Sequence, residues 1–165
     1  PVRSKNGFQS IGPGSVIDLT AATDLTVADH AGRIVTMDPV GTPTAITLPT
    51  IIATADGASA GPGRDPNNAS TVGTTFEILF IDEFTGTIST DGTDKFVGSL
   101  SVMEASGLTD TYAPAASNDV ISMNGTTTGG DKGSYIEITA IEDNVYLVQG
   151  MLLGSGEAVT PFADS

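Results

Sequence analysis

The feature that most constrains this chain is a series of short apolar alternations separated by glycine-rich turns in residues 118–165. Apolar and polar side chains alternate with a period of two in 120–124, which is typical of a β-strand with one buried face. The same period runs through 135–141, where Ile141 falls one place out of step and so predicts a β-bulge or the strand end. Residues 145–153 predict a third strand. We therefore expect a three-stranded antiparallel meander here.

The same pattern predicts further strands earlier in the chain. They are residues 15–20, 33–37, 44–49, 74–81, 84–90 and 96–103. Because only a short turn separates 33–37 from 44–49, we expect these two to form a hairpin. The dipeptide Asp91–Gly92 is a strong signal for a hairpin turn between its neighbouring strands. The most apolar run, 74–81, is expected to be a central strand.

The remaining segments lack this alternation. Residues 24–29 predict a turn or a short strand. Residues 53–73 and 105–118 are rich in Ala, Gly, Asp, Pro and Asn and predict loops, with Tyr112 as an apolar anchor in the second. A loop as long as 53–73 is uncommon inside a compact domain unless it is functional or mobile.

Nine or ten short strands with turn signals between them predict an all-β fold. We expect an antiparallel β-sandwich or barrel, jelly-roll-like, formed by a single β domain over residues 15–165. Residues 1–14 carry three glycines and two prolines and predict an extended N-terminal arm. Leu, Ile, Val and Phe make up 40 of 165 residues, close to the level of about 20% below which chains tend to be disordered. The core should therefore be thin, which suits a protomer of an oligomer.

The charge balance excludes several classes of partner. Six Lys and Arg residues stand against twenty Asp and Glu residues, giving a formal net charge of −14. A nucleic-acid-binding protein needs basic residues to neutralise phosphates, and the same negative field disfavours anionic membranes. No apolar stretch approaches the roughly 20 residues of a membrane span. We expect neither nucleic acid nor membrane as a partner, and the absence of cysteine excludes disulfides and thiolate metal sites.

Catalytic chemistry has few candidate residues. The only histidine is His30, so a Ser-His-Asp arrangement would have to use it with Asp29 or Asp38. No Gly-x-Ser-x-Gly elbow is present, and we interpret His30 as a polar turn residue. Carboxylate pairs for glycoside hydrolysis are available, but the chain has no Trp and three Tyr to form a sugar platform. We therefore expect no enzyme activity, no catalytic residue and no cofactor.

Two carboxylate pairs are candidates for cation binding. They are Asp91 with Asp94, and Asp82 with Glu83. Calcium needs six to eight oxygen ligands, and neither pair follows the EF-hand spacing. Solvated turns are the preferred interpretation, so no metal site is predicted. The glycine-rich segment 125–133 lacks the Gly-Lys-Ser/Thr ending of a phosphate-binding loop, and its Asp131 would repel phosphate.

Two stretches together resemble a known class of proteins. One is Ala31-Gly32-Arg33-Ile34-Val35-Thr36-Met37 followed by Thr44-Ala45-Ile46-Thr47-Leu48-Pro49. The other runs from Asn118-Asp119-Val120-Ile121 through Asn124-Gly125-Thr126-Thr127-Thr128-Gly129-Gly130 to Gly150 and Thr160-Pro161-Phe162. These stretches resemble the small β-rich structural proteins of tailed bacteriophages, in particular the head decoration, or cement, proteins. The resemblance covers about half of the chain.

The resemblance implies a function and a location. Proteins of this class form homotrimers on the outer capsid surface and stabilise the capsid by binding the major capsid protein lattice. The resemblance also implies that this chain is a virion protein made in the host cytoplasm. The arm is either a frayed terminus or a capsid anchor; as an anchor, its capsid-binding residues would be Arg3, Lys5, Phe8 and Ile11. The alternatives are a trimeric phage tail fibre or receptor-binding domain, using the loops at 53–73 and 105–118, and a bacterial glycan-binding module.

Overall fold

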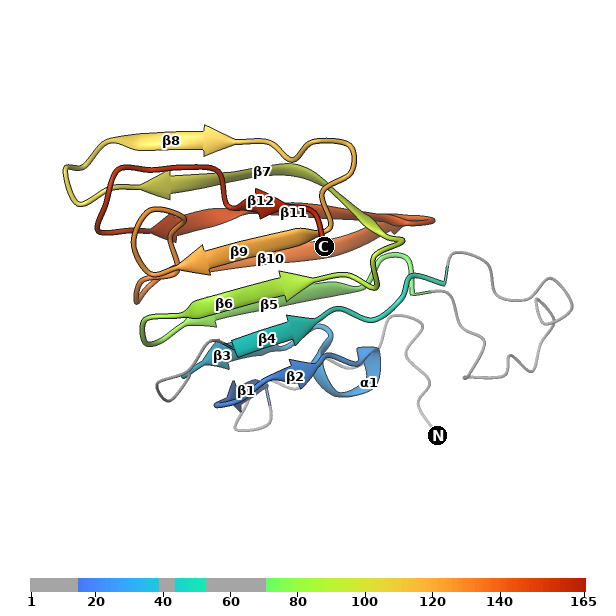
Figure 1. Cartoon of the computed structure of the whole chain (residues 1–165). Coiled ribbons are helices and arrows are strands. Elements are labelled where there is room, and N and C mark those ends of the chain that lie inside the picture. Colours follow the sequence, from blue (N-terminus) through green and yellow to red (C-terminus); the bar gives the residue numbers. More distant parts are fainter. Residues whose placement is uncertain (1–14, 39–43, 53–70) are drawn as a thin grey trace, which may run out of the picture.

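Two β-sheets packed face to face form the body of the protein in a computed structural model that describes residues 15–38, 44–52 and 71–165 (Figure 1). The seven-stranded sheet contains, in spatial order, β1 (Val16–Leu19), β3 (Ile34–Met37), β5 (Thr75–Phe80), β10 (Tyr135–Glu142), β11 (Val145–Leu153), β7 (Lys95–Met103) and β8 (Thr109–Tyr112). The five-stranded sheet contains β12 (Phe162–Ala163), β9 (Val120–Asn124), β6 (Thr85–Ser89), β4 (Thr44–Thr47) and β2 (Thr23–Asp24). The all-β sandwich predicted from the sequence is confirmed. Half of the strand pairs are parallel, so both sheets are mixed and not purely antiparallel as predicted.

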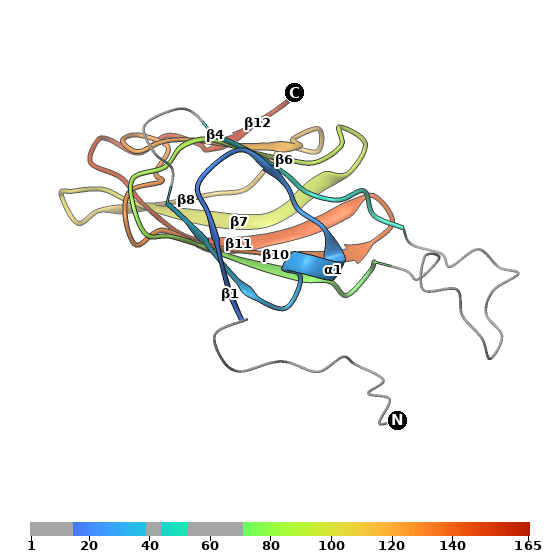
Figure 2. The ribbon, with the colours of Figure 1, turned by 90° about the horizontal axis from the view of Figure 1, so that it is seen from below.

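The first six strands alternate between the two sheets. β1, β3 and β5 are parallel neighbours in one sheet, and β2, β4 and β6 are parallel neighbours in the other. Figure 2 shows the two layers, with the chain passing repeatedly from one to the other and the short helix α1 (Val27–His30) at their β1–β2 edge. Two predictions are therefore wrong. Strands β3 and β4 do not form a hairpin, and Asp91–Gly92 connects strands of different sheets, because each strand buries its apolar face in the shared core from the opposite side.

The C-terminal third departs from the predicted meander in one strand. β10 and β11 form the expected antiparallel hairpin, and a register shift between Ala140 and Glu142 confirms the irregularity predicted at Ile141. β9 instead pairs with β6 and β12 in the other sheet. The loop 125–133 makes this crossing, and the Phe84 amide donates a hydrogen bond of 2.7 Å to the carbonyl of Gly130. Because alternation reports burial and not the pairing partner, the meander prediction is wrong for β9.

The core lies between the sheets. On β5, the side chains of Phe76, Ile78 and Phe80 point inward and are fully buried. From the other sheet, Ile88 and Ile121 meet them. Each such side chain contributes about 1.5–3 kcal/mol by leaving water. β5 is paired on both sides, with β3 and β10, so the prediction of a central strand is confirmed.

Three short elements, α1, β8 and the two-residue strand β12, were missed by the sequence patterns. The predicted turn or short strand at 24–29 begins as the two-residue strand β2, but a helix follows because the Thr26 hydroxyl accepts a hydrogen bond from the Asp29 amide and caps the first turn. Part of the predicted loop 105–118 is strand β8, which pairs with β7. The hydroxyl of Thr111 on β8 lies 3.0 Å from the hydroxyl of Ser101 on β7. β8 is an edge strand with polar side chains on both faces, so it shows no alternation.

Candidate interaction face

The outer face of the seven-stranded sheet carries exposed apolar side chains on five of its strands and a half-buried leucine on β5. We call this surface the apolar face and define it by the outward side chains of β1, β3, β5, β10, β11 and β7. Its most exposed members are Val16 (47%), Ile34 (41%), Val97 (40%), Tyr135 (37%) and Met151 (47%). Large contiguous apolar surfaces on soluble proteins commonly mark contacts with a partner.

The strand register arranges these side chains in rows. The rows are Val16–Ile34, then Leu79–Tyr135–Met151, then Leu147–Val97 and Leu153–Met103. Directly opposed residues on neighbouring strands have Cβ atoms about 4.5–5.5 Å apart, so the members of a row touch or nearly touch. The described residues place no helix or loop over this face (Figure 2). The apolar side chains therefore form short rows of two or three residues, and polar side chains such as Thr36 and Ser101 continue these rows along the register.

The outer face of the five-stranded sheet is different. Its outward positions are mostly polar: Thr47, Thr85, Thr87, Ser89, Ser122 and Asn124, with Ala45 and Asp24 at the β4–β2 side and Val120 and Ala163 at the β9–β12 side. A sheet with one solvated face normally shows this polar pattern. The two outer faces belong to one chain, so overall composition does not explain the apolar character of the first. The apolar face has the surface chemistry of a contact region.

Two carboxylates interrupt the apolar face near its centre. Glu77 on β5 and Glu137 on β10 are directly opposed in the antiparallel register. Glu137 accepts hydrogen bonds from the Gln149 amide (2.7 Å) and the Tyr135 hydroxyl (3.1 Å). Burial, followed by the Glu137 hydrogen bond and the charges of Glu137 and Glu77, raises the pKa of the Tyr135 hydroxyl. In the described part of the chain, the single ion pair involves neither carboxylate.

That ion pair lies at the junction of the sheets. The Lys95 ammonium donates to Asp119 Oδ2 at 2.7 Å and to the Gly92 carbonyl at 2.7 Å. The amide of Ser165 donates to Asp119 Oδ1 at 2.8 Å. The hydrogen bond from Lys95 is the largest effect on the Asp119 carboxyl and holds its pKa below the ordinary value. This cluster joins β7, β9 and the C-terminal residue, and its role is structural.

The predicted cation candidates are held by backbone amides. Asp91 Oδ1 accepts from the amides of Thr93 (2.8 Å) and Asp94 (3.1 Å). Buried Asp94 accepts from the Ile51 amide at 2.9 Å through Oδ2, while its Oδ1 has no hydrogen-bond partner. Asp82 Oδ1 accepts from the Glu83 amide. Across residues 15–38, 44–52 and 71–165, no three Asp, Glu or His side chains are grouped to hold a metal ion.

The histidine is part of the helix cap. His30 is buried and ends α1, and its Nδ1 accepts a hydrogen bond of 2.9 Å from the Thr26 amide. Asp29 bonds to the Thr26 hydroxyl at 2.9 Å. These contacts make His30 a cap residue of a short helix, where the sequence predicted a polar turn residue. The geometry around it stabilises the turn between β2 and β3.

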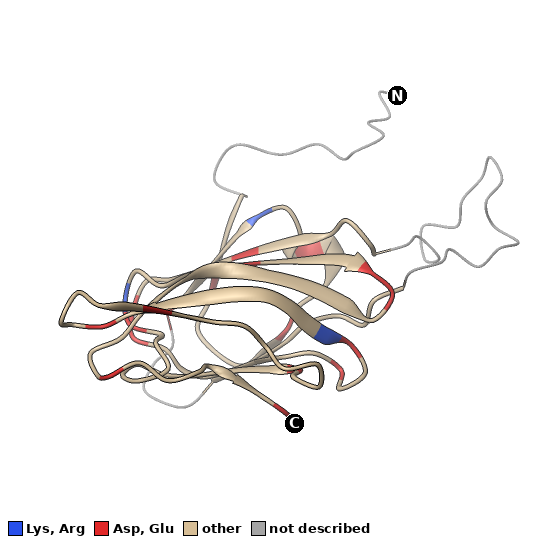
Figure 3. Ribbon diagram, turned by 90° about the horizontal axis from the view of Figure 1, so that it is seen from above, with Lys and Arg blue, Asp and Glu red and all other residues tan. Residues whose placement is uncertain are grey.

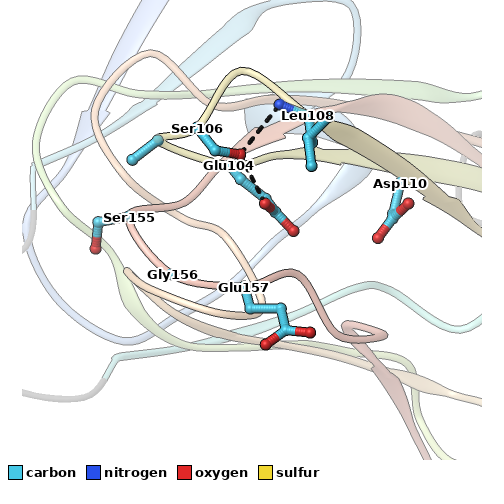
Figure 4. Close-up of a pocket in the computed structure, with 8 residues that line it drawn as sticks. Glu104, Ser106, Leu108, Asp110, Ser155, Gly156 and Glu157 are labelled. Carbon is cyan, nitrogen blue, oxygen red and sulfur yellow. Dashed lines mark hydrogen bonds between the residues drawn. The ribbon is translucent and has the colours of Figure 1, made fainter.

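An open hollow of about 580 Å³ lies at the β7–β8 turn (Figure 4). Three of its lining residues are acidic: Glu104, Asp110 and Glu157. The Glu104 carboxylate accepts hydrogen bonds of 2.9 Å from the Ala158 amide and the Ser106 hydroxyl, and the first of these is the main cause that lowers the pKa of Glu104. Glu104 therefore fixes the 154–161 segment against the turn.

The predicted capsid-binding residues Arg3, Lys5, Phe8 and Ile11 lie outside the described residues, as does most of the loop at 53–73. The apolar face was not named from the sequence. Its signal is the run of apolar residues at 145–153, where alternation assigns only Tyr146, Val148 and Leu152 to the core. Leu147, Met151 and Leu153 are the excess, and they lie on the apolar face.

Comparisons with protein families, with characterised proteins and with solved structures find no significant match to this chain. The helix in the described residues is far too short to cross a membrane.

Proposed function

We propose that this protein is a structural component of a bacteriophage particle that decorates the capsid and stabilises it by binding the outer surface of the major capsid protein lattice. The observation that carries the proposal is the apolar face. A sheet face with exposed Ile34, Tyr135 and Met151 gains free energy when a second surface covers it. The resemblance to decoration proteins supplies the identity of that surface.

The charge of the chain fits a protein displayed on a particle. In Figure 3, acidic positions greatly outnumber basic ones, and most lie in loops and at strand ends. A net charge of −14 opposes adhesion to nucleic acid and to other particles. The proposal also assigns capsid contacts to Arg3, Lys5, Phe8 and Ile11 of the arm, which complement the apolar face with basic and apolar groups.

The test is binding of purified protein to capsids that lack decoration, measured by cosedimentation and by mass spectrometry of the particle. We expect hundreds of copies per particle for the wild type. The single variants Ile34→Glu and Met151→Glu should each bind capsids with at least tenfold lower affinity, since each places a charge on the apolar face. Thr87→Glu, on the outer face of the other sheet, is the matched control and should bind normally.

A variant that lacks residues 1–11 is measured in the same binding experiment. Its binding should be weakened most at low salt, because exposed charges are screened over about 8 Å at physiological ionic strength. Failure of the wild type to bind capsids would overturn the proposal. A copy number of a few to some tens, located at the tail, would favour the tail fibre or receptor-binding alternative.

A further inference from the structure

We propose that Asn124–Gly125 is a latent covalent modification site, at which the asparagine loses ammonia only when the loop 125–133 opens. Asn-Gly sequences deamidate more readily than other asparagine sequences, because glycine has no side chain to hinder attack by its own amide nitrogen. Within residues 15–38, 44–52 and 71–165, this is the single Asn-Gly dipeptide. It lies where β9 ends and the chain crosses from one sheet to the other.

The reaction uses the backbone nitrogen of Gly125 as its nucleophile. That nitrogen loses its proton and bonds to Cγ of Asn124, the bond from Cγ to Nδ2 breaks, and ammonia leaves with the proton. Water then opens the cyclic imide at one of its two carbonyl groups and gives either aspartate or isoaspartate. Two groups must therefore be free for the first step, the amide of Gly125 and the side chain of Asn124.

The amide of Gly125 is not free in the folded protein. Gly125 is buried, and its N–H donates a hydrogen bond of 2.8 Å to the carbonyl of Gly129. The Glu83 side chain lies directly against Gly125, in the space that a Cβ atom would occupy. A nearby negative charge disfavours the formation of another, so this carboxylate opposes loss of the amide proton. The folded loop therefore withholds the nucleophile.

The side chain of Asn124 is held as well, although it is exposed. Its Oδ1 accepts hydrogen bonds from the amides of Thr126 (2.9 Å) and Thr128 (3.1 Å) and from the Thr126 hydroxyl (3.0 Å). Its Nδ2 donates to the Thr127 hydroxyl at 3.0 Å. The two amide donors identify the atom between them as the oxygen. The side chain cannot rotate toward the Gly125 nitrogen without giving up these bonds.

Opening of the loop releases both groups at once, because the bonds that restrain them all lie within residues 124–129. The isoaspartate product adds a methylene group to the backbone where Asn124 pairs with Thr85. The hydrogen bond from Gly125 to Gly129 then cannot re-form in register, so this product keeps the crossing open. Aspartate, in contrast, retains the normal backbone and can accept the same hydrogen bonds.

The test follows the conversion of Asn124 by peptide mass spectrometry while the wild type is incubated at mildly alkaline pH. One sample is folded in buffer and the other is unfolded in urea at the same pH. We expect conversion to be at least tenfold slower in the folded protein. Equal rates in the two samples would refute the inference.

Two variants separate the hydrogen bonds of Asn124 from the general stability of the fold. Thr127→Val removes the acceptor of Nδ2 and should raise the conversion rate of the folded protein severalfold. Thr87→Val is the matched control, because Thr87 pairs with Ser122 and not with Asn124, and it should convert as slowly as wild type. A folded Thr127→Val protein that also converts as slowly as wild type would show that these bonds do not protect the asparagine. If Thr127→Val does not fold, the comparison of folded and unfolded wild type decides.

Discussion

Two buried carboxylates near the sheet junction have opposite electrostatic environments. Burial is the main cause that raises the pKa of the Asp94 carboxyl, assisted by the charges of Asp91 and Asp143 and opposed by the Ile51 amide and Lys95. The pKa of Asp119 is lowered, chiefly by the hydrogen bond from Lys95. Folding therefore favours the protonated form of Asp94 and the charged form of Asp119. The two side chains should affect the pH dependence of stability with opposite sign.

We predict opposite pH trends for Asp94→Asn and Asp119→Asn in the free energy of unfolding. The folded wild type holds the Asp94 proton more tightly than the unfolded chain does, so its stability contribution falls as pH rises from 3.8 through the raised folded pKa. Asp94→Asn should gain stability relative to wild type over that interval. Asp119 contributes stability that is fully present above pH 3.8 and is lost as pH falls through its lowered folded pKa. The destabilisation caused by Asp119→Asn should therefore grow as pH rises from that lowered pKa to 3.8.

Urea unfolding of both variants between pH 3 and 7 measures these differences, with exposed Asp24→Asn as the control. Parallel pH profiles for wild type and Asp94→Asn would contradict the assignment. The sequence could not predict this behaviour, because Asp91-Gly92-Thr93-Asp94 has the composition of a solvated turn. The amide that fixes Asp94 belongs to Ile51, 43 residues earlier in the chain.

At the scale of elements, the parallel pairing of β4 with β6 depends on a close approach of two backbones. The position that permits it is Gly86, where a Cβ atom would lie 1.8 Å from the carbonyl oxygen of Thr44. Thr44 is the residue paired with Gly86 in the register. A side chain at this position would force β4 away from β6 and disturb the centre of the five-stranded sheet.

We predict that Gly86→Ala lowers the free energy of unfolding by about 1–3 kcal/mol, the usual cost of forcing extra atoms into a packed region. Chemical denaturation measures the loss, and hydrogen exchange should place the weakened amides in β4 and β6. Thr87→Ala, the next residue on the same strand with its side chain directed outward, is the control. A Gly86→Ala variant as stable as this control would mean that the sheet relaxes without cost.

The existence of most strands was predictable, but among the pairings that were predicted only that of β10 with β11 was correct. The period of two in segments such as β5 and β10 is a local property, and it identified most of the long strands. Pairing depends on which side of the core each strand occupies, so β3 with β4 and β6 with β7 looked like hairpins while they lie in different sheets. The excess of apolar residues in β11 indicated an exposed apolar surface. The extent of the apolar face could not be predicted, because it depends on how six strands pair.

At the scale of the whole molecule, the apolar face divides into two chemically distinct parts. The carboxylates Glu77 and Glu137 lie in the part formed by β5 and β10. The part formed by β11 and β7 presents Leu147, Val97, Leu153 and Met103. The second part, which has two apolar rows, suits contact between copies of this chain.

We predict a homotrimer in solution, held by the uncharged part of the apolar face. Native mass spectrometry and light scattering at micromolar concentration should give about three times the mass of the 16.7 kDa chain. Val97→Glu, which adds a charge to each of three adjoining copies, should shift the population toward monomer, whereas Thr87→Glu should not. A wild type that stays monomeric away from capsids would contradict this prediction.

The alternation of the first six strands between the two sheets has a mechanical consequence. A hairpin protein pulled by its ends unzips one pair at a time, but here β1 and β2 are the outermost strands of different layers. Tension applied at the N-terminal side should detach β1 from one sheet, then β2 from the other, and continue to alternate between the two sheets. Single-molecule stretching should therefore give successive lengthening steps from the β1–β2 edge, while the hairpin of β10 and β11 yields last.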